Sequence, residues 1–323
     1  MNAQQYILAA LDELKSPVQV APLKKSESLE DPIYAKVMSK KFRKVKADDR
    51  VVETTREAIA FAVKNNQPLR MCVLFGGNKL WRLDEAPEID WAELFSAIYY
   101  TKWMKYIASV YEPGVSIAYY AMDISVEELD NIPKADLYAY YKSFMTMLDF
   151  IQPHLPERVE LKYTKYGDLF DSKEHYNKER EEARVQWLED NGGKLPEMTP
   201  AKIAATELNV KLLPGQDDDP DWRAKNELMH RAAMGTKTMK KYRNAGEIIQ
   251  TCPIAHPNTI GTGSTKKSYA KFWVGVGALE RKGDSYNQIV LTPKQLEAAN
   301  FDWQDIEIPS LVGKNFSKIR IVN

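Results

Sequence analysis

The sequence predicts an α/β fold with a mostly parallel, Rossmann-like sheet flanked by helices. Two apolar runs have the character of strands, residues 69–75 and 115–122, and the segment between them has helical spacing. A strand, a crossover helix and a second strand form the βαβ unit of a parallel sheet. A glycine pair and a lysine follow the first run, and Asp123 follows the second. We therefore expect both groups at the sheet edge where open α/β folds bind ligands.

Four segments are expected along the chain. Residues 1–50 form an N-terminal helical segment, 51–165 the Rossmann-like core, 166–245 a charged helical insertion or lid, and 246–323 a C-terminal α+β segment that folds back on the core. Further helices are expected at 1–15, 32–46, 51–63 and 134–151, and a third strand at 159–163. In the last segment, β-like runs cover 247–252, 272–279, 288–291, 306–308 and 319–322.

The helix after the glycine pair has a recognisable start. Asp90 precedes Trp91-Ala92-Glu93, which fits a capping box in which Asp90 accepts from a backbone amide and Glu93 reaches back. Apolar residues then recur near helical spacing, so one helix face is expected to pack on the sheet. Glu93 has two interpretations, a cap or a catalytic acid, and the cap is favoured.

Composition excludes several classes of protein. The 45 basic and 45 acidic residues cancel, so the chain as a whole is not built to coat nucleic acid or an anionic membrane. Cys72 and Cys252 are too few for a disulfide framework, which indicates a reducing, cytoplasmic location. No apolar stretch approaches the roughly 20 residues that span a bilayer, so no membrane partner is expected. The histidines lack zinc-ligand spacing, and we predict no metal and no cofactor.

Polar groups gather after the two strands. The candidate catalytic residues are Lys79, Glu93 and Asp123. The candidate phosphate-binding residues are Gly76, Gly77, Asn78, Arg82, Thr262, Ser264 and Lys266. Lysine and arginine neutralise a phosphate or carboxylate, while a carboxylate takes a proton from an amine or hydroxyl. The alternative is an ordinary ion pair between Lys79 and Asp123 at the rim of the sheet.

The last three binding candidates lie in a segment rich in glycine, hydroxyl groups and lysine, residues 258–268. Successive amides in such a loop can form an anion nest, although the order of residues matches no Walker motif. A plain surface loop is the alternative. Gly275 and Gly277 follow on one face of the expected strand, where they leave room for a close-packed backbone or for a ligand.

Two basic segments are candidates for contact with nucleic acid. Lys40–Lys46 is the densest basic run, and Lys237–Arg243 adds a second with Tyr242 available for stacking. A solvated helix face explains such runs more often than phosphate contact does.

Residues 69–148 resemble the isonitrile synthase and dityrosine-biosynthesis family. The shared features are a Phe-Gly turn with a nearby lysine, the helix start from Ala86 to Leu94, the Tyr111-Glu112-Pro113-Gly114 entry to the second strand, and Asp123 at its end. Family members have Phe-Pro-Phe-Lys-Ser at the turn and Ser-Asp-Gly at the strand end, and this chain departs from both. On that pattern Lys79 stands near the family lysine, Glu93 for the helix glutamate and Asp123 for the strand-end aspartate.

The resemblance implies a transferase or lyase with a phosphorylated small-molecule substrate. It would condense the amine of an amino acid with a pentulose phosphate and convert that amine to an isocyanide. Three alternatives stay open: another transferase or lyase acting on a sugar phosphate or nucleotide-like substrate, a nucleic-acid-modifying or nucleotide-sugar-dependent glycosyltransferase, and a non-catalytic protein that binds nucleic acid or another partner. The sequence does not indicate an oligomeric state.

Overall fold

A computed structural model describes residues 1–18, 28–44, 46–75, 87–207, 210–216, 219, 221–244, 246–252, 259–262, 272–311 and 313–323. Its centre is a parallel sheet of five strands in the order β3-β2-β1-β4-β5. These strands are β1 (Leu69–Phe75), β2 (Val115–Ala121), β3 (Val159–Lys165), β4 (Ile248–Cys252) and β5 (Ile260–Gly261). The predicted α/β fold class is confirmed.

The strand order places a topological switch point between β1 and β4. After β1, the strands β2 and β3 are added on one side of it, and β4 then pairs with β1 on its other side. Ligands of open α/β sheets bind beyond the carboxyl ends of the strands at such a point. Phe75 pairs with Ala121, so the carboxyl ends of β1 and β2 lie at the same edge, as predicted.

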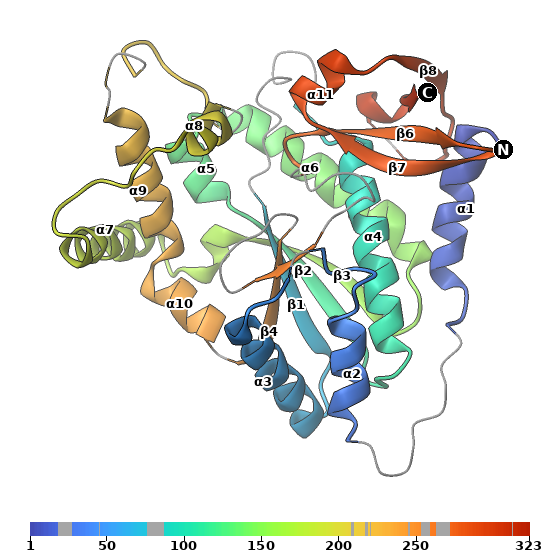
Figure 1. Cartoon of the computed structure of the whole chain (residues 1–323), viewed down its shortest axis with the longest axis horizontal. Helices are drawn as coiled ribbons and strands as arrows, with labels where there is room; N and C mark the ends of the chain where they lie inside the picture. Colours follow the sequence, from blue (N-terminus) through green and yellow to red (C-terminus); the bar gives the residue numbers. More distant parts are fainter. Residues whose placement is uncertain are drawn as a thin grey trace.

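Helices connect these strands and cover the sheet (Figure 1). The first three, α1 (Ala3–Lys15), α2 (Glu30–Val37) and α3 (Asp49–Asn65), precede β1. The helix α4 (Trp91–Ala108) joins β1 to β2, and α5 (Asp123–Leu129) and α6 (Lys134–Ile151) join β2 to β3. A 3-10 turn, η2 (Gln152–His154), follows α6.

The helix α4 is buried on more than the one face that its sequence suggests. Its buried residues include Trp91, Ile98, Trp103 and Ile107, and they occur all around the helix. Contacts run to β2 and β3 of the parallel sheet and also to β6 and β7 of a second sheet. A helix that is buried on several faces belongs in an interior, and α4 contacts both sheets.

The second sheet has four strands in the order β7-β6-β9-β8. They are β6 (Val276–Lys282), β7 (Ser285–Leu291), β8 (Phe301–Asp305) and β9 (Lys318–Val322), with α11 (Pro293–Ala298) after β7 and the 3-10 turn η4 (Lys314–Phe316) before β9. Figure 1 shows this sheet beside the start of α1. The expected strand at 272–279 begins four residues late, because Phe272 and Trp273 pack on Phe75 instead. The expected strand at 306–308 is wrong, since β8 ends at Asp305.

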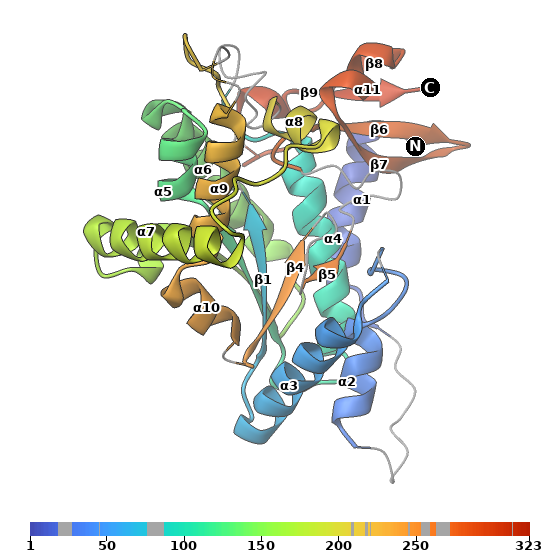
Figure 2. The ribbon, with the colours of Figure 1, turned by 60° about the vertical axis from the view of Figure 1, so that its left-hand side comes forward.

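The charged segment between β3 and β4 is helical, as predicted. It contains η3 (Tyr166–Leu169), α7 (Lys173–Asp190), α8 (Pro200–Glu207), α9 (Trp222–Met234) and α10 (Lys237–Asn244). A small core of its own holds it together, formed by Tyr166, Phe170, Tyr176, Ala233 and Met239. Figure 2 shows α7, α9 and α10 grouped on one side of β1.

The predicted helix at 32–46 is wrong in its second half. The helix α2 ends at Val37, and the chain turns through the following residues. Phe42 there packs against the rings of Tyr99, Trp103 and Tyr106 on α4, and Arg43 forms an isolated bridge with Thr262. The basic run is therefore not one face of a helix.

Among the described residues, no helix has both the length and the apolar character that are needed to cross a membrane.

Candidate functional site

The carboxyl edge of the parallel sheet is formed by three paired strand ends. Phe75 of β1 pairs with Ala121 of β2, which pairs with Lys165 of β3. Asp123 follows two residues after Ala121 as the first residue of α5, and Gly167 lies just beyond Lys165 in η3. The structure thus places predicted Asp123 at the predicted edge.

The Asp123 carboxylate is half-buried and bonded to the backbone. Its Oδ1 accepts a hydrogen bond from the Gly167 amide at 2.9 Å. Burial raises the pKa of Asp123, and the amides of Gly167 and Ile124 and the charge of Lys165 act in the opposite direction. A carboxylate with a raised pKa at a ligand-binding edge is suited to accept and return a proton. The hydrogen bond also gives Asp123 a structural role, because it ties the end of β2 to η3.

Two tyrosines beside Asp123 were not predicted as site residues. Burial raises the pKa of Tyr163 and of Tyr141, and the nearby Asp123 charge raises both further. Their rings lie 6.1 Å apart. The Tyr163 hydroxyl is buried and has no hydrogen-bond partner among the residues that the structure describes. Both phenols therefore stay protonated at neutral pH. The Tyr163 hydroxyl proton is not donated to any residue that the structure describes. In the sequence both tyrosines fit the pattern of core aromatics, so nothing there indicated that they lie near Asp123.

An aromatic cluster surrounds the end of β1, and we call it the Phe75 cluster. Its other members have ring centroids 4.9 to 6.4 Å from that of Phe75: Tyr119, Tyr140, Tyr141, Phe144, Phe272 and Trp273. These rings come from β2, from α6 and from the segment before β6. Phe75 is only 1% exposed, so this cluster is core packing at the end of β1.

Glu93 lies at the buried start of α4. Its side chain accepts from the Asp90 amide at 2.8 Å and from the Tyr140 hydroxyl at 2.8 Å, and the residue is 0% exposed. Asp90 in turn accepts from the Ala92 amide at 2.8 Å, which completes the predicted capping box. The cap interpretation of Glu93 is confirmed. A catalytic role for Glu93 stays a prediction.

Gly275 and Gly277 serve close packing. A Cβ on Gly277 would lie 2.4 Å from the Cβ of Trp91 and 2.5 Å from the nitrogen of Ala92. A Cβ on Gly275 would lie 2.5 Å from a Val290 methyl group. The Gly277 amide also donates to Asp90 at 3.2 Å, so β6 is seated directly on the N-terminus of α4. Of the two predicted uses of these glycines, the close-packed backbone is the one observed.

Thr262 is fully enclosed beside β5. Its hydroxyl lies 2.7 Å from the Tyr100 hydroxyl and donates to the Cys252 carbonyl at 3.1 Å. Burial raises the pKa of Tyr100 far above its usual range, so Tyr100 remains a donor within this pair. A phosphate contact by Thr262 requires these bonds to open, and it stays a prediction.

The other site candidates lie outside the described residues: Gly76, Gly77, Asn78, Lys79, Arg82, Ser264 and Lys266. Lys79 comes four residues after Phe75 in the sequence, and its relation to Asp123 stays a prediction. Within the described ranges, no three His, Cys, Asp or Glu side chains come together as a metal site.

The two basic segments differ in their contacts. Lys41 donates to the Tyr106 hydroxyl at 2.9 Å, and this bond lowers the pKa of Tyr106. Lys237, at the start of α10, pairs with Glu182 at 2.6 Å. Contact of either segment with nucleic acid stays a prediction.

Comparisons with known proteins bear on the fold. Neither a protein-family model nor a curated protein matches the sequence. A crystal structure of PvcA from Pseudomonas aeruginosa resembles the chain with a TM-score of 0.57 at 14% identity, covering 91% of this chain and 100% of that one. Similarity at this identity establishes a shared fold over nearly the whole length.

Proposed function

We propose that the chain is an isonitrile-synthase-like enzyme, a transferase or lyase that joins an amino acid to a pentulose phosphate. The observation that carries the proposal is the position of Asp123, at the same sheet edge as Phe75. The segment with Gly76, Gly77 and Lys79 starts directly after Phe75. The fold shared with PvcA supports a distant relationship to the isonitrile synthase family.

Each group at this edge has a role in the proposal. Lys79 and Arg82 neutralise the phosphate, with the Gly76 and Gly77 amides as further donors. Asp123 accepts the proton that the amino-acid nitrogen loses, because its raised pKa makes it a better base than an exposed carboxylate.

Transfer of a labelled carbon tests the proposal. The purified protein is incubated with uniformly ¹³C-labelled pentulose phosphate and each amino acid in turn, and products are analysed by mass spectrometry. The proposal predicts an amino-acid product that carries one labelled carbon on its nitrogen. Absence of labelled carbon from every amino acid, with a folded protein, contradicts it.

The same assay with Asp123→Asn separates catalysis from background chemistry. The amide keeps an acceptor for the Gly167 amide but cannot take a proton. The product should fall by about 100-fold or more, the usual contribution of a general base. If the wild type and Asp123→Asn make equal amounts of product, a group other than Asp123 accepts the proton from the amino-acid nitrogen.

A further inference from the structure

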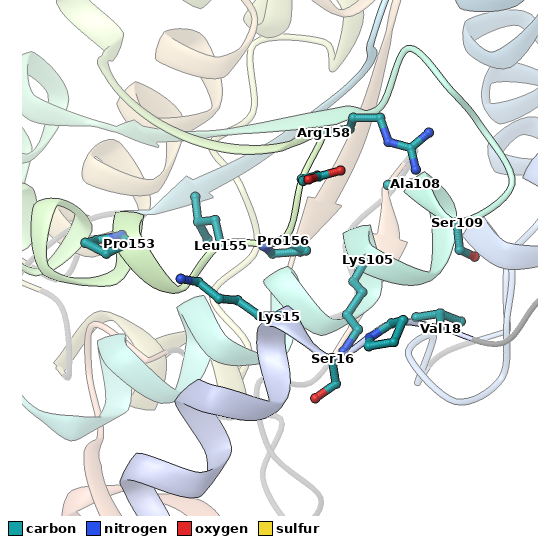
Figure 3. A pocket seen from close by; sticks show the side chains of 12 residues that line it. Lys15, Ser16, Val18, Lys105, Ala108, Ser109, Pro153, Leu155, Pro156 and Arg158 are labelled. Atoms are coloured by element: carbon teal, nitrogen blue, oxygen red, sulfur yellow. The ribbon is translucent and has the colours of Figure 1, made fainter.

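A cavity lies at the end of the parallel sheet opposite to the Asp123 edge. It has a volume of about 650 Å³, between the C-terminal ends of α1 and α4 and the segment that enters β3 (Figure 3). Arg158 lines it and immediately precedes β3, whereas the Asp123 edge lies beyond the carboxyl ends of the strands. The seven residues of β3 separate the two ends by roughly 20 Å, at about 3.3 Å per residue.

Three cations and one carboxylate line this cavity. They are Lys15, Lys105, Arg158 and Glu157, and Figure 3 shows the Lys15 and Arg158 side chains extending toward opposite sides of the view. Three positive charges and one negative leave a net charge of +2 in the lining. A phosphate monoester carries up to two negative charges at neutral pH, which matches this excess.

Ion pairs of these three cations with carboxylates are absent among the described residues. In the part of the chain that the structure describes, none of the three has a carboxylate oxygen within 4.0 Å. Lys105 instead donates to the Glu13 backbone carbonyl at 2.5 Å, while the Glu13 carboxylate pairs with Lys102 at 2.6 Å. Burial lowers the pKa of Lys105, and the nearby charge of the Glu13 carboxylate acts in the opposite direction. An anion in the cavity would oppose the effect of burial in the same way.

Arg158 is held in a backbone conformation that favours glycine. Its φ is +64°, in the left-handed region, which costs a residue with a side chain about 1 kcal/mol. Gly114 packs against it so closely that a Cβ on Gly114 would lie 2.2 Å from the Arg158 oxygen. The Val115 amide donates to the same oxygen at 2.8 Å. Residues held in such conformations are found more often at functional sites than elsewhere.

We propose that this cavity binds a small phosphorylated metabolite, at a site separate from the Asp123 edge. The planar Arg158 guanidinium is the group best suited to hold two phosphate oxygens at once, and Lys15 and Lys105 add point charges. The volume is within the range of about 300 to 1,000 Å³ found for small-molecule sites. The proposal does not depend on the reaction proposed above, because none of its residues belongs to that site.

Isothermal titration with inorganic phosphate, ribose 5-phosphate and AMP tests the site, at an ionic strength kept constant with potassium chloride. At least one probe should bind one-to-one with a Kd below about 1 mM. Arg158→Gly and Lys105→Gln should each weaken that binding by about 10-fold or more. Lys282→Gln is the matched control, an exposed lysine of β6 outside the cavity lining, and it should bind as the wild type does.

The variants remain informative because Arg158→Gly should fold at least as well as the wild type. Glycine adopts φ of +64° without strain, so the loss of the side chain is not accompanied by loss of the backbone conformation. Absence of binding by all three probes overturns the proposal. So does binding that Arg158→Gly and Lys105→Gln leave intact but Asp123→Asn removes, since the anion then occupies the other end of the sheet.

Discussion

The Tyr140 hydroxyl donates a hydrogen bond to the buried Glu93 carboxylate at 2.8 Å, and this bond joins α6 to the N-terminus of α4. The Tyr140 ring also lies 6.4 Å from that of Phe75 at the end of β1. The start of α4 and the predicted ligand edge are thus held by the same side chain.

Removal of the Glu93 carboxylate should destabilise the protein. Glu93→Ala removes a fully buried carboxyl group and leaves two buried donors without their acceptor, so the free energy of unfolding should fall by about 3 kcal/mol or more. Glu93→Gln should lose less, because glutamine also fits the capping box. Urea denaturation measures both. A Glu93→Gln protein of near wild-type stability that makes no labelled product would show that Glu93 also acts as a catalytic acid.

Gly277→Ala should loosen the second sheet from α4. The new methyl group meets Trp91 and the Ala92 amide at 2.4 and 2.5 Å, and overpacking of this kind costs about 1 to 3 kcal/mol. Hydrogen exchange should rise in β6 and at the start of α4 and stay unchanged in β2. An exchange pattern identical to that of the wild type would mean that the two elements do not depend on this contact.

Asp123→Asn should stabilise the protein at neutral pH while it lowers activity. Burial raises the pKa of Asp123 in the folded state, so its ionised form favours the unfolded chain. Asp123→Asn should therefore have a higher free energy of unfolding than the wild type at pH 7. This difference should disappear as the pH falls below about 4, where the carboxyl group is protonated in both the folded and the unfolded chain. Urea denaturation at the two pH values measures it. An Asp123→Asn protein that is less stable than the wild type at pH 7 contradicts the raised pKa of Asp123 in the folded state.

Salt dependence should separate a small phosphorylated substrate from nucleic acid. A pentulose phosphate that binds the folded state raises the melting temperature, and most of the shift should persist from 50 to 200 mM salt as working values. A nucleic acid held at six to ten phosphates through Lys40–Lys46 and Lys237–Arg243 would lose about 10³ to 10⁵ in affinity over this range. Stabilisation by RNA or DNA alone, lost with salt, would favour the nucleic-acid hypothesis.

The sequence predicts the bounds of a helix or strand correctly where apolar periodicity and flanking helix or strand breakers indicate the same ends. The strand β1 and the helix α6 match their predicted bounds, because apolar periodicity and flanking breakers point to the same ends. Asp123 was placed correctly because parallel pairing brings strand ends together. The prediction of a helix over 32–46 is wrong after Val37, where α2 ends. Phe42 packs on Trp103 of α4, and this tertiary contact overrides the helix propensity of the lysine and arginine residues around it.

The parts that could not be predicted depend on residues far apart in the chain. Tyr163 and Tyr141 have the ordinary pattern of core aromatics, and only the fold brings them near enough to Asp123 for its charge to raise their pKa. The basic cavity joins Lys15, Lys105 and Arg158 from three separate segments. None of the three lies in a basic run, so charge patterning gave no indication of it.

The central claim is that a phosphorylated small molecule reacts at the carboxyl edge of β1 and β2, with Lys79 as a required group. The most direct measurement is labelled-carbon transfer by Lys79→Ala beside the wild type and Lys282→Gln, with the melting temperature of each. The account predicts that Lys79→Ala loses the product and keeps its melting temperature, while Lys282→Gln keeps both. Full activity in Lys79→Ala, or a variant that fails to fold, contradicts it.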